Sequence, residues 1–282
     1  MDITKVAVIG SGTMGNGIAH IFSMKNFKVF LVEMEQSLLD RGMNMINSNM
    51  ERQIKKGIIT VEDKHLFLKN IQPIIGITKL PNDIQLIIEA ITEDKDVKLS
   101  LFKKLENIID KKSIFASNTS SISITELGSS CRPDNFIGMH FMNPVPVMEL
   151  VEVIRGYSTS DDTFNKIKEI ALYLNKRPVE VFDYPGFISN RVLLPMINEA
   201  IFALYEGVAT AEDIDTVMKL GMNHPMGPLT LADFIGLDVC LAIMEVLYKG
   251  FNDSKYRPCP LLKKMVAAGK LGRKSGNGFY KY

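Results

Sequence analysis

Apolar residues in the first part of the chain form short runs that are separated by segments of helical spacing. The run over residues 5–9 is rich in β-branched side chains and ends at a glycine, and residues 15–25 then carry apolar side chains at the spacing of one helix face. A second run over residues 28–32 stops at Glu33. This order of strand, helix and strand predicts a βαβ unit of the size that a parallel sheet requires.

Further short apolar runs continue the alternation. They predict strands at 86–91, 113–116, 136–140 and 150–154, with helix-like segments such as 99–109 between them. Strands that alternate with helices are typical of a parallel sheet with helices on both faces. We therefore predict an α/β fold with an N-terminal, Rossmann-type doubly wound sheet.

The pattern changes after Asp183. Residues 184–187 combine proline and glycine in turn chemistry, and helical periodicities replace the strand-like runs beyond them. The helical periodicities cover residues 192–205, 211–220, 229–248 and 261–268. The predicted organisation is a Rossmann-type domain over residues 1–184 and an all-α C-terminal domain over residues 185–282.

Composition narrows the class of partner. The 282 residues include 33 Lys plus Arg and 32 Asp plus Glu, a net charge of +1, and neither sign forms a long block. A general affinity for nucleic acid or for a membrane surface therefore has no electrostatic support, and a small molecule is the expected partner. The chain reaches its first strand too early for a leader segment, and its three scattered cysteines fit neither a disulfide scaffold nor a zinc site. We expect a cytoplasmic protein.

A glycine-rich turn follows the first predicted strand. Residues 10–15 have the G-x-G-x-x-G form and lie directly after a strand and at the start of a helix, which is where a dinucleotide fingerprint belongs. In such a turn the first glycine makes the tight bend, the second lets a pyrophosphate approach the backbone, and the third allows close helix packing. The cofactor-binding residues predicted here are Gly10, Ser11, Gly12, Thr13, Met14 and Gly15.

Glu33 adds a preference between cofactors. It ends the second predicted strand, 23 residues after Gly10, near the usual position of the acid that bonds the adenine ribose hydroxyls. A carboxylate there repels a ribose 2′-phosphate, and Met34 supplies no compensating charge. NAD is therefore favoured over NADP. The alternative is a glycine-rich turn followed by a surface glutamate, which the register of strand, helix and acid disfavours.

One histidine and one carboxylate are the candidates for proton transfer. His140 ends the strand predicted at 136–140, and Glu152 is the single carboxylate inside the apolar strand predicted at 150–154. Burying a carboxylate alone is costly, so a partner is expected, and His140 is the nearest. Such a pair would fix the imidazole tautomer and raise its basicity. The alternative places Glu152 on the solvated face of an edge strand.

Residues 116–121 supply small hydroxyl and amide groups directly after another predicted strand, at the edge where open α/β sheets bind ligands. An ordinary cluster of helix N-caps would look similar, and both interpretations stay open. Asn190, at the entrance to the helical domain, is uninformative without further context.

Seven separate motifs, in one order along nearly the whole chain, resemble the 3-hydroxyacyl-CoA dehydrogenase family. These motifs are Gly10 to Gly15, Ser117 to Ser121, Met139 to Pro144, Leu150 to Ile154, Pro185 to Arg191, Asn223 to Pro228 and Gly272 to Gly276. So many motifs in order make the resemblance specific. It implies an enzyme that interconverts a 3-hydroxyacyl-CoA and the matching 3-ketoacyl-CoA, with NAD as cofactor and no metal.

The resemblance also implies a role for each matching position. His140 would be the catalytic base and Glu152 its orienting partner, while Ser120 and Asn190 would bond the reacting oxygen of the substrate. The positions that match NAD contacts are Glu93, Lys98, Ser120, Asn143 and Lys274. The positions that match contacts to CoA are Asn49 and Lys56, which share a helix face with Gln53.

Two departures from the family pattern are mild. The family often has aspartate where Glu33 stands, and it often has alanine at the position of Ser11. Two alternatives keep part of this pattern. Another NAD-dependent dehydrogenase of β-hydroxy acids or sugar acids would keep the glycines, and a structural or NAD-sensing protein would keep the fold without activity.

The expected partners are an acyl-CoA substrate and further copies of the chain, in a homodimer or higher homo-oligomer. The apolar stripe over residues 193–204 forms the core of its own domain, or a dimer interface in addition to that core.

Overall fold

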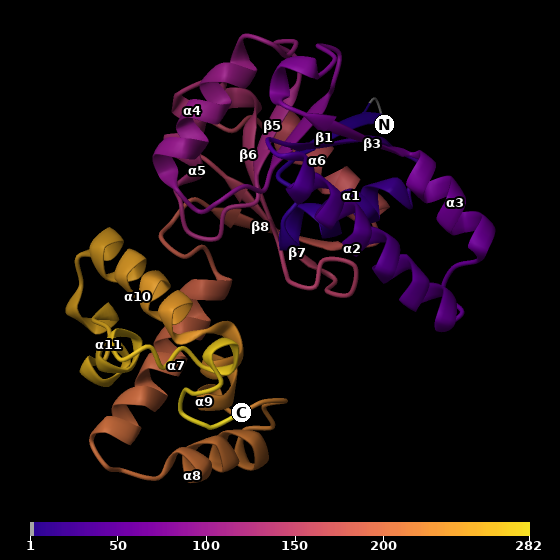
Figure 1. Cartoon of the computed structure of the whole chain (residues 1–282). Coiled ribbons are helices and arrows are strands. Elements are labelled where there is room, and N and C mark those ends of the chain that lie inside the picture. Colours follow the sequence, from indigo (N-terminus) through magenta and orange to yellow (C-terminus); the bar gives the residue numbers. More distant parts are fainter. Residues whose placement is uncertain (1–2) are drawn as a thin grey trace. The chain divides into compact units, whose positions relative to one another are not determined.

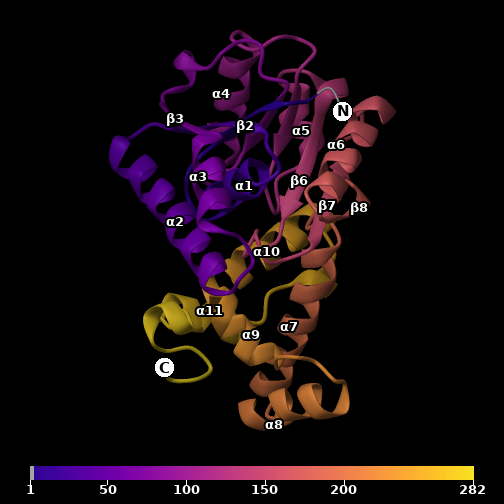
Figure 2. The same ribbon diagram turned by 90° about the vertical axis from the view of Figure 1, so that its right-hand side faces the viewer.

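The computed structural model describes residues 3–282, and these form two compact units (Figures 1 and 2). The first unit ends at Asp183 and the second spans Tyr184–Tyr282. The first contains the whole sheet with its helices, and the second is built from helices and short turns. Within the described residues no helix is both long and apolar enough to cross a membrane.

An eight-stranded sheet organises the first unit, with the strand order β3-β2-β1-β4-β5-β6-β7-β8. All neighbouring strands pair in parallel except β6 and β7, which are antiparallel, so β7 and β8 run against the other six. The strands are β1 (Lys5–Ile9), β2 (Lys28–Glu33), β3 (Ile71–Ile75), β4 (Leu86–Glu89), β5 (Ile114–Ser117), β6 (Phe136–Phe141), β7 (Leu150–Arg155) and β8 (Arg177–Phe182). The predicted fold class is confirmed.

The pattern of apolar residues failed to indicate the two edge strands. β3 contains Pro73 and β8 contains Pro178, and both strands alternate irregularly between buried and exposed residues. An edge strand needs neither a continuous apolar run nor every backbone N–H, and proline is tolerated there for that reason. The six inner strands carry the continuous apolar runs that the sequence showed.

Helices cover both faces of the sheet. Apolar residues of α1 (Thr13–Ser23), α2 (Gln36–Lys55) and α6 (Asp161–Tyr173) join those of the strands in one core. The opposite face carries α4 (Lys95–Glu106) and α5 (Ile124–Ser129), where Phe102 stacks on Phe115 at a centroid distance of 5.8 Å. The remaining helix, α3 (Val61–Lys69), contacts α2 and forms a helical hairpin with it at one end of the unit (Figure 1).

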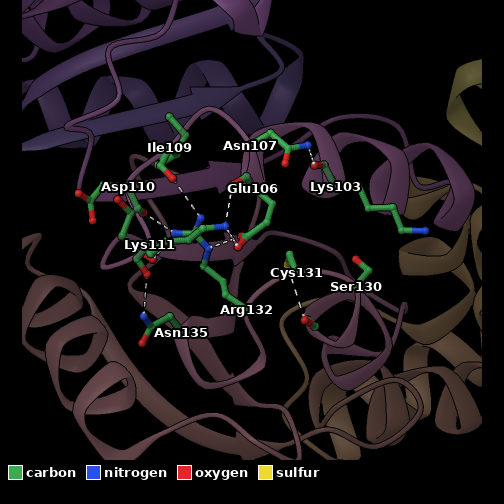
Figure 3. Close-up of polar contacts among 12 residues, drawn as sticks. Lys103, Glu106, Asn107, Ile109, Asp110, Lys111, Ser130, Cys131, Arg132 and Asn135 are labelled. Atoms are coloured by element: carbon green, nitrogen blue, oxygen red, sulfur yellow. Dashed lines mark hydrogen bonds and ion pairs between the residues drawn. The ribbon is translucent and has the colours of Figure 1, made fainter.

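Arg132 forms hydrogen bonds that join several segments on the sheet face covered by α4 (Figure 3). Its guanidinium group is almost fully buried and lies 3.8 Å from the centroid of the Phe115 ring. It donates to the Glu106 carboxylate at 2.8 Å and to the carbonyl oxygens of Asp110 and Ser113 at 2.7 and 2.9 Å. These bonds satisfy a buried cation and tie the end of α4 and the start of β5 to the segment that leads into β6.

The second unit packs its helices around a core of its own. The helices are α7 (Ser189–Tyr205), α8 (Ala211–Thr216) with a π-helical turn over Val217–Gly221, α9 (Pro228–Ile235), α10 (Leu237–Phe251) and α11 (Pro260–Ala267). Ile197 and Ile201 are buried in this core, and Leu193 and Leu204 pack against it. The apolar stripe of α7 therefore belongs to the interior of its own unit.

The single helix suggested by the periodicity over residues 229–248 was wrong. Two helices, α9 and α10, meet at Gly236, whose φ of 103° lies in the region that only glycine adopts without strain. The apolar periodicity continues across this break because both helices face the same core. Periodicity reports which face is buried and does not by itself reveal where one helix ends.

Asp233 secures the end of the chain to the helical unit. Its carboxylate is 1% exposed and accepts hydrogen bonds from the backbone N–H groups of Phe279 and Tyr280 at 3.0 and 2.9 Å, and from the Tyr282 hydroxyl at 3.2 Å. A methyl group on Gly278 would lie 2.0 Å from the same carboxylate, so the backbone approaches it as closely as glycine permits. One buried acceptor thus orders the last residues.

We predict that Asp233→Ala lowers the free energy of unfolding by about 2 kcal/mol, because two half-buried backbone donors lose their buried acceptor. Urea unfolding followed by circular dichroism measures this difference. Glu212→Ala is the control, since Glu212 is exposed on α8 of the same unit and its removal should change stability by less than about 0.5 kcal/mol. Equal stability of the Asp233 variant and the wild-type protein would contradict the prediction.

Candidate active site

The fingerprint turn between β1 and α1 is packed so closely that two of its positions leave no room for any side chain. A Cβ on Gly15 would lie 1.8 Å from the carbonyl oxygen of Gly10, and a Cβ on Gly10 would lie 2.6 Å from that of Ala90. Gly10 also has a φ of 98°, a conformation that side chains disfavour. These two glycines are therefore required by the packing of the turn itself.

Gly12 differs from the other two glycines of the turn. A Cβ there would meet no heavy atom within 4 Å, so the space beside it is open. Gly12 is the N-cap of α1 and, within residues 3–282, no side chain caps this helix and no acidic residue lies in its first turn. The helix N–H groups and the positive end of the helix dipole thus face a space that fits a phosphate group.

Glu33 is held in place by the fingerprint turn. One carboxylate oxygen accepts from the backbone N–H of Ser11 at 2.9 Å and from its hydroxyl at 3.1 Å, and the other accepts from the N–H of Met34 at 2.9 Å. Glu33 lines two cavities. An acid in this position can bond ribose hydroxyls without leaving the sheet edge.

The larger of these cavities, which we call the α4 cavity, has a volume of about 890 Å³. Its walls come from the ends of β1 and β2, the turn after β3, and α4. Most of the lining side chains are apolar, among them Ile9, Val32, Ile77, Ile91, Val97 and Leu101. Apolar walls beside the carboxylate of Glu33 suit a flat ring attached to a ribose, so the residues present fit the adenosine half of NAD.

The smaller one, which we call the loop cavity, has a volume of about 390 Å³. Gly12, Thr13, Asn16 and Gly17 line one side of it, and residues 143–146 line another. Asn49 of α2 also borders this cavity, whereas Lys56 is the C-cap of α2 and is exposed. The structure thus brings Asn49 and Asn143 to the same cavity as the fingerprint turn.

His140 and Glu152 form a buried pair. They are direct cross-strand partners in β6 and β7, and the distance from His140 Nδ1 to Glu152 Oε2 is 2.7 Å. Their residues are 9% and 2% exposed, and β7 is an inner strand, so the alternative of a solvated Glu152 on an edge strand was wrong. An Nδ1–H that donates to the carboxylate leaves the lone pair of the imidazole on Nε2, which is the tautomer a general base requires.

A second cluster of charges contains the buried Lys98 and the partly exposed Glu93. The Lys98 ammonium group is 1% exposed, lies 3.3 Å from one oxygen of Glu93, and donates to Glu89 at 2.5 Å. The other oxygen of Glu93 accepts from the Ser120 N–H at 2.9 Å and from the Thr119 hydroxyl at 2.6 Å. The cluster therefore joins the end of β4, helix α4 and the turn that carries Ser120.

The charges of this cluster depend on their partners. Burial opposes the charge of Glu93, but Lys98 and the hydroxyl and amide donors outweigh it and lower the pKa of the Glu93 carboxyl. Burial raises the pKa of Glu89, although Lys98 and the hydroxyl of Ser117 act in the opposite direction. One cation thus serves two carboxylates, and removal of Lys98 would leave the buried Glu89 carboxylate without a charged partner.

The cluster over residues 116–121 does not cap a helix. The N-cap of α5 is Ser123, whose hydroxyl accepts from the Glu126 N–H at 3.1 Å. Thr119 instead bonds Glu93, and the Asn118 side-chain oxygen accepts from the Phe141 N–H at 3.0 Å, next to His140. Of the two open interpretations, the helix-cap cluster was therefore wrong.

Two residues that organise this edge were missed in the sequence. Glu89 ends the apolar run of β4, and the argument that gave Glu152 a partner applies equally to it. Asn118 lies inside the motif that we quoted, yet its role depends on which strand lies next to β5, which no local pattern reveals.

Two predicted residues belong to the helical unit. Asn190 lies in the first turn of α7. Lys274 lies in a short 3₁₀ helix, Arg273–Ser275, and forms an ion pair with Asp238 of α10 at 2.5 Å. Burial raises the pKa of the Asp238 carboxyl, but Lys274 outweighs this effect, so the pKa is lowered.

Comparisons with known proteins agree with this geometry. The family model described as "3-hydroxyacyl-CoA dehydrogenase, NAD binding domain" matches residues 5–184, and the C-terminal domain of the same family matches residues 186–282. The 3-hydroxybutyryl-CoA dehydrogenase of Bradyrhizobium diazoefficiens is 53% identical over 99% of this chain and 96% of its own. That of Clostridioides difficile is 50% identical over 99% of each chain.

A solved structure is similar over its whole length. The crystal structure of the (S)-3-hydroxybutyryl-CoA dehydrogenase PaaH1 from Ralstonia eutropha has a TM-score of 0.97 and 48% identity, covering 100% of this chain and 99% of that one. The two family models together leave only the first residues and one residue at position 185 unmatched. The chain therefore belongs to the 3-hydroxyacyl-CoA dehydrogenase family and carries its NAD-binding domain.

Proposed function

We propose that this chain acts as an NAD-dependent (S)-3-hydroxybutyryl-CoA dehydrogenase, which transfers a hydride between nicotinamide and C3 of a short-chain 3-hydroxyacyl-CoA, with acetoacetyl-CoA as the ketone. The observation that carries the proposal is the buried contact of 2.7 Å between His140 and Glu152. Relatives that are 50 and 53% identical and bear the name 3-hydroxybutyryl-CoA dehydrogenase support the choice of acyl chain.

His140 is the proposed base. In the oxidative direction its Nε2 takes the proton of the 3-hydroxyl group, and Glu152 stabilises the imidazolium that forms. In the reductive direction the imidazolium donates the proton to the developing alkoxide. When bound, NAD supplies the hydride chemistry, while the protein positions the groups and moves the proton. Ser120 and Asn190 are proposed to bond the reacting oxygen.

The cofactor contacts are proposed from the fingerprint turn and the charge cluster. Residues 10–15 and Glu33 would hold the pyrophosphate and the adenine ribose, with the base in the α4 cavity. Glu93, Lys98, Ser120, Asn143 and Lys274 are proposed to contact the rest of NAD. The network that joins Glu93 to Ser120 supports a shared role for these two residues.

The CoA contacts and the setting are also proposals. Asn49 borders the loop cavity and Lys56 is an exposed cation at the end of α2, which suits the charged groups of CoA. The three cysteines form no disulfide in the described chain, which supports a cytoplasmic location. We also propose that the protein is a homodimer and that the helical unit forms the substrate cleft and the dimer contact. The proposed metabolic role is in butyrate or fatty acid metabolism.

Oxidation of NADH with acetoacetyl-CoA, compared with free acetoacetate, tests the activity, and substitutions at the buried pair test the mechanism. We expect turnover with the CoA ester only.

His140→Ala should lower kcat by about 10²–10⁴-fold while the affinity for NADH stays nearly unchanged, because the cofactor contacts lie elsewhere. Glu152→Gln should also lower kcat, since an amide cannot stabilise the imidazolium.

Glu169→Gln is the matched control for the pair. Glu169 is exposed on α6, so the loss of its charge should leave kcat unchanged. Normal turnover of Glu152→Gln would remove the pair from the mechanism, and turnover of free acetoacetate at the same rate would refute the proposed substrate.

Glu33 should determine the choice between NADH and NADPH. We expect Glu33→Ala to reduce the preference for NADH by about tenfold, chiefly through better binding of NADPH, because like charges brought together cost several kcal/mol. The ratio of kcat/KM with the two cofactors measures the change. Glu35→Ala is the control, since Glu35 is exposed two residues further along. A wild-type protein that prefers NADPH would contradict this prediction.

Lys56 should act on CoA and not on NADH. We expect Lys56→Glu to raise the KM for acetoacetyl-CoA by about fivefold, with a smaller effect in added salt because contacts of exposed charges are screened. Steady-state kinetics at two ionic strengths measure both effects. Lys69→Glu, an exposed lysine at the end of α3, is the matched charge reversal. An equal rise in the KM for both substrates would indicate general damage to the fold instead.

A further inference from the structure

The loop between β6 and β7, residues 142–149, has little apolar anchoring of its own. It connects the strands of His140 and Glu152 and forms a wall of the loop cavity through residues 143–146. Val145 is its one buried side chain, whereas Val147 and Met148 are 71 and 42% exposed. Something other than the burial of its side chains must hold the far half of this loop.

Lys176 supplies that hold. It lies between α6 and β8, and the residue is 6% exposed. Its ammonium group donates to the carbonyl oxygen of Val145 at 2.6 Å and to that of Met148 at 2.6 Å. The two short bonds reach the loop on both sides of its exposed tip. Backbone bonds from the N–H groups of residues 147 and 148 to the carbonyl oxygen of Pro144 close the turn, and Lys176 is the side chain that ties it to the rest of the unit.

A buried ammonium group is a costly way to hold a loop. Burial lowers the pKa of Lys176, and the charge of Glu149 only partly opposes this. Desolvation of a cation is repaid only when acceptors are fixed at short distance. The arrangement is therefore directional: it holds two carbonyl groups at set points, whereas an apolar side chain would merely fill the space.

The other side of the loop faces α1, the helix that follows the fingerprint turn. A Cβ on Gly17 of α1 would lie 2.9 Å from the Cβ of Val145, so the loop lies directly against this helix. Gly17 and the fingerprint residues Gly12 and Thr13 line the same cavity as residues 143–146. A displacement of the loop would therefore change the width of the loop cavity beside the fingerprint turn.

We propose that Lys176 is a positioning residue: its buried ammonium group fixes the loop between β6 and β7, and through it Asn143 and the wall of the loop cavity opposite the fingerprint turn. This inference rests on the proposed function in one respect, that NAD binds along the fingerprint turn. It does not depend on which acyl-CoA is the substrate.

Lys176→Met, which keeps the length of the side chain and removes its charge, tests the proposal. We expect the dissociation constant of NADH, measured by fluorescence titration, to rise about tenfold, in line with the loss of a hydrogen bond to a charged group. Amide hydrogen exchange should accelerate over residues 145–149 and stay unchanged in β1 and β4. Lys176→Arg keeps the charge and the donors and should recover most of the affinity.

Lys166→Met is the matched control, because Lys166 lies on α6 in an exposed ion pair with Asp162. It should leave both measurements unchanged. If Lys176→Met fails to fold, Lys176→Gln, which removes the charge and shortens the side chain by one atom, takes its place with the same expected loss. Unchanged NADH affinity with unchanged exchange in the loop would overturn the proposal. So would faster exchange throughout the unit or the failure of both variants to fold, since Lys176 would then serve stability alone.

The outcomes separate this proposal from the proposed function. NADH titration and hydrogen exchange use no acyl-CoA. A wild-type protein that binds NADH but does not reduce acetoacetyl-CoA would refute the substrate while leaving the Lys176 test intact.

Discussion

The antiparallel pairing of β6 and β7 is the constraint on which the site depends. In a parallel sheet the next strand would begin at the opposite edge, and a residue near its start would lie far from His140. Reversal of β7 returns the chain at the same edge and sets Glu152 directly across from His140. A slip of one residue would turn the carboxylate to the other face of the sheet, so the register of this one pair determines whether the imidazole has a partner.

The rest of the sheet edge follows a common plan, in which buried polar groups join the ends of neighbouring strands. Asn118 ties β5 to β6, and Glu89 with Lys98 ties β4 to α4. Each contact would be costly if half made, and each is satisfied by residues from a different element. The edge is therefore held by interactions that require all of its elements to be in place, which suits a site that must keep several groups aligned.

The sequence allowed the inner strands, the fingerprint turn and the contact between His140 and Glu152 to be predicted, because each leaves a local pattern: an apolar run, spaced glycines, or a lone acid among apolar residues. Edge strands β3 and β8 were missed because solvent on one side relaxes that pattern. The break at Gly236 was hidden because the two helices share one buried face. Lys176 was missed because a lysine before a strand looks like a surface residue until its acceptors, about thirty positions away, are known.

The three fingerprint glycines carry different kinds of information about ancestry. Gly10 and Gly15 are demanded by neighbouring backbone atoms of this chain, whereas the space beside Gly12 is open. Selection for a stable fold therefore acts on the first and third glycines, and selection for a bound dinucleotide acts on the second. A descendant of this protein that no longer bound its cofactor would keep Gly10 and Gly15 and could accept substitutions at Gly12. A substitution at the middle glycine is therefore the one that would mark the loss of dinucleotide binding.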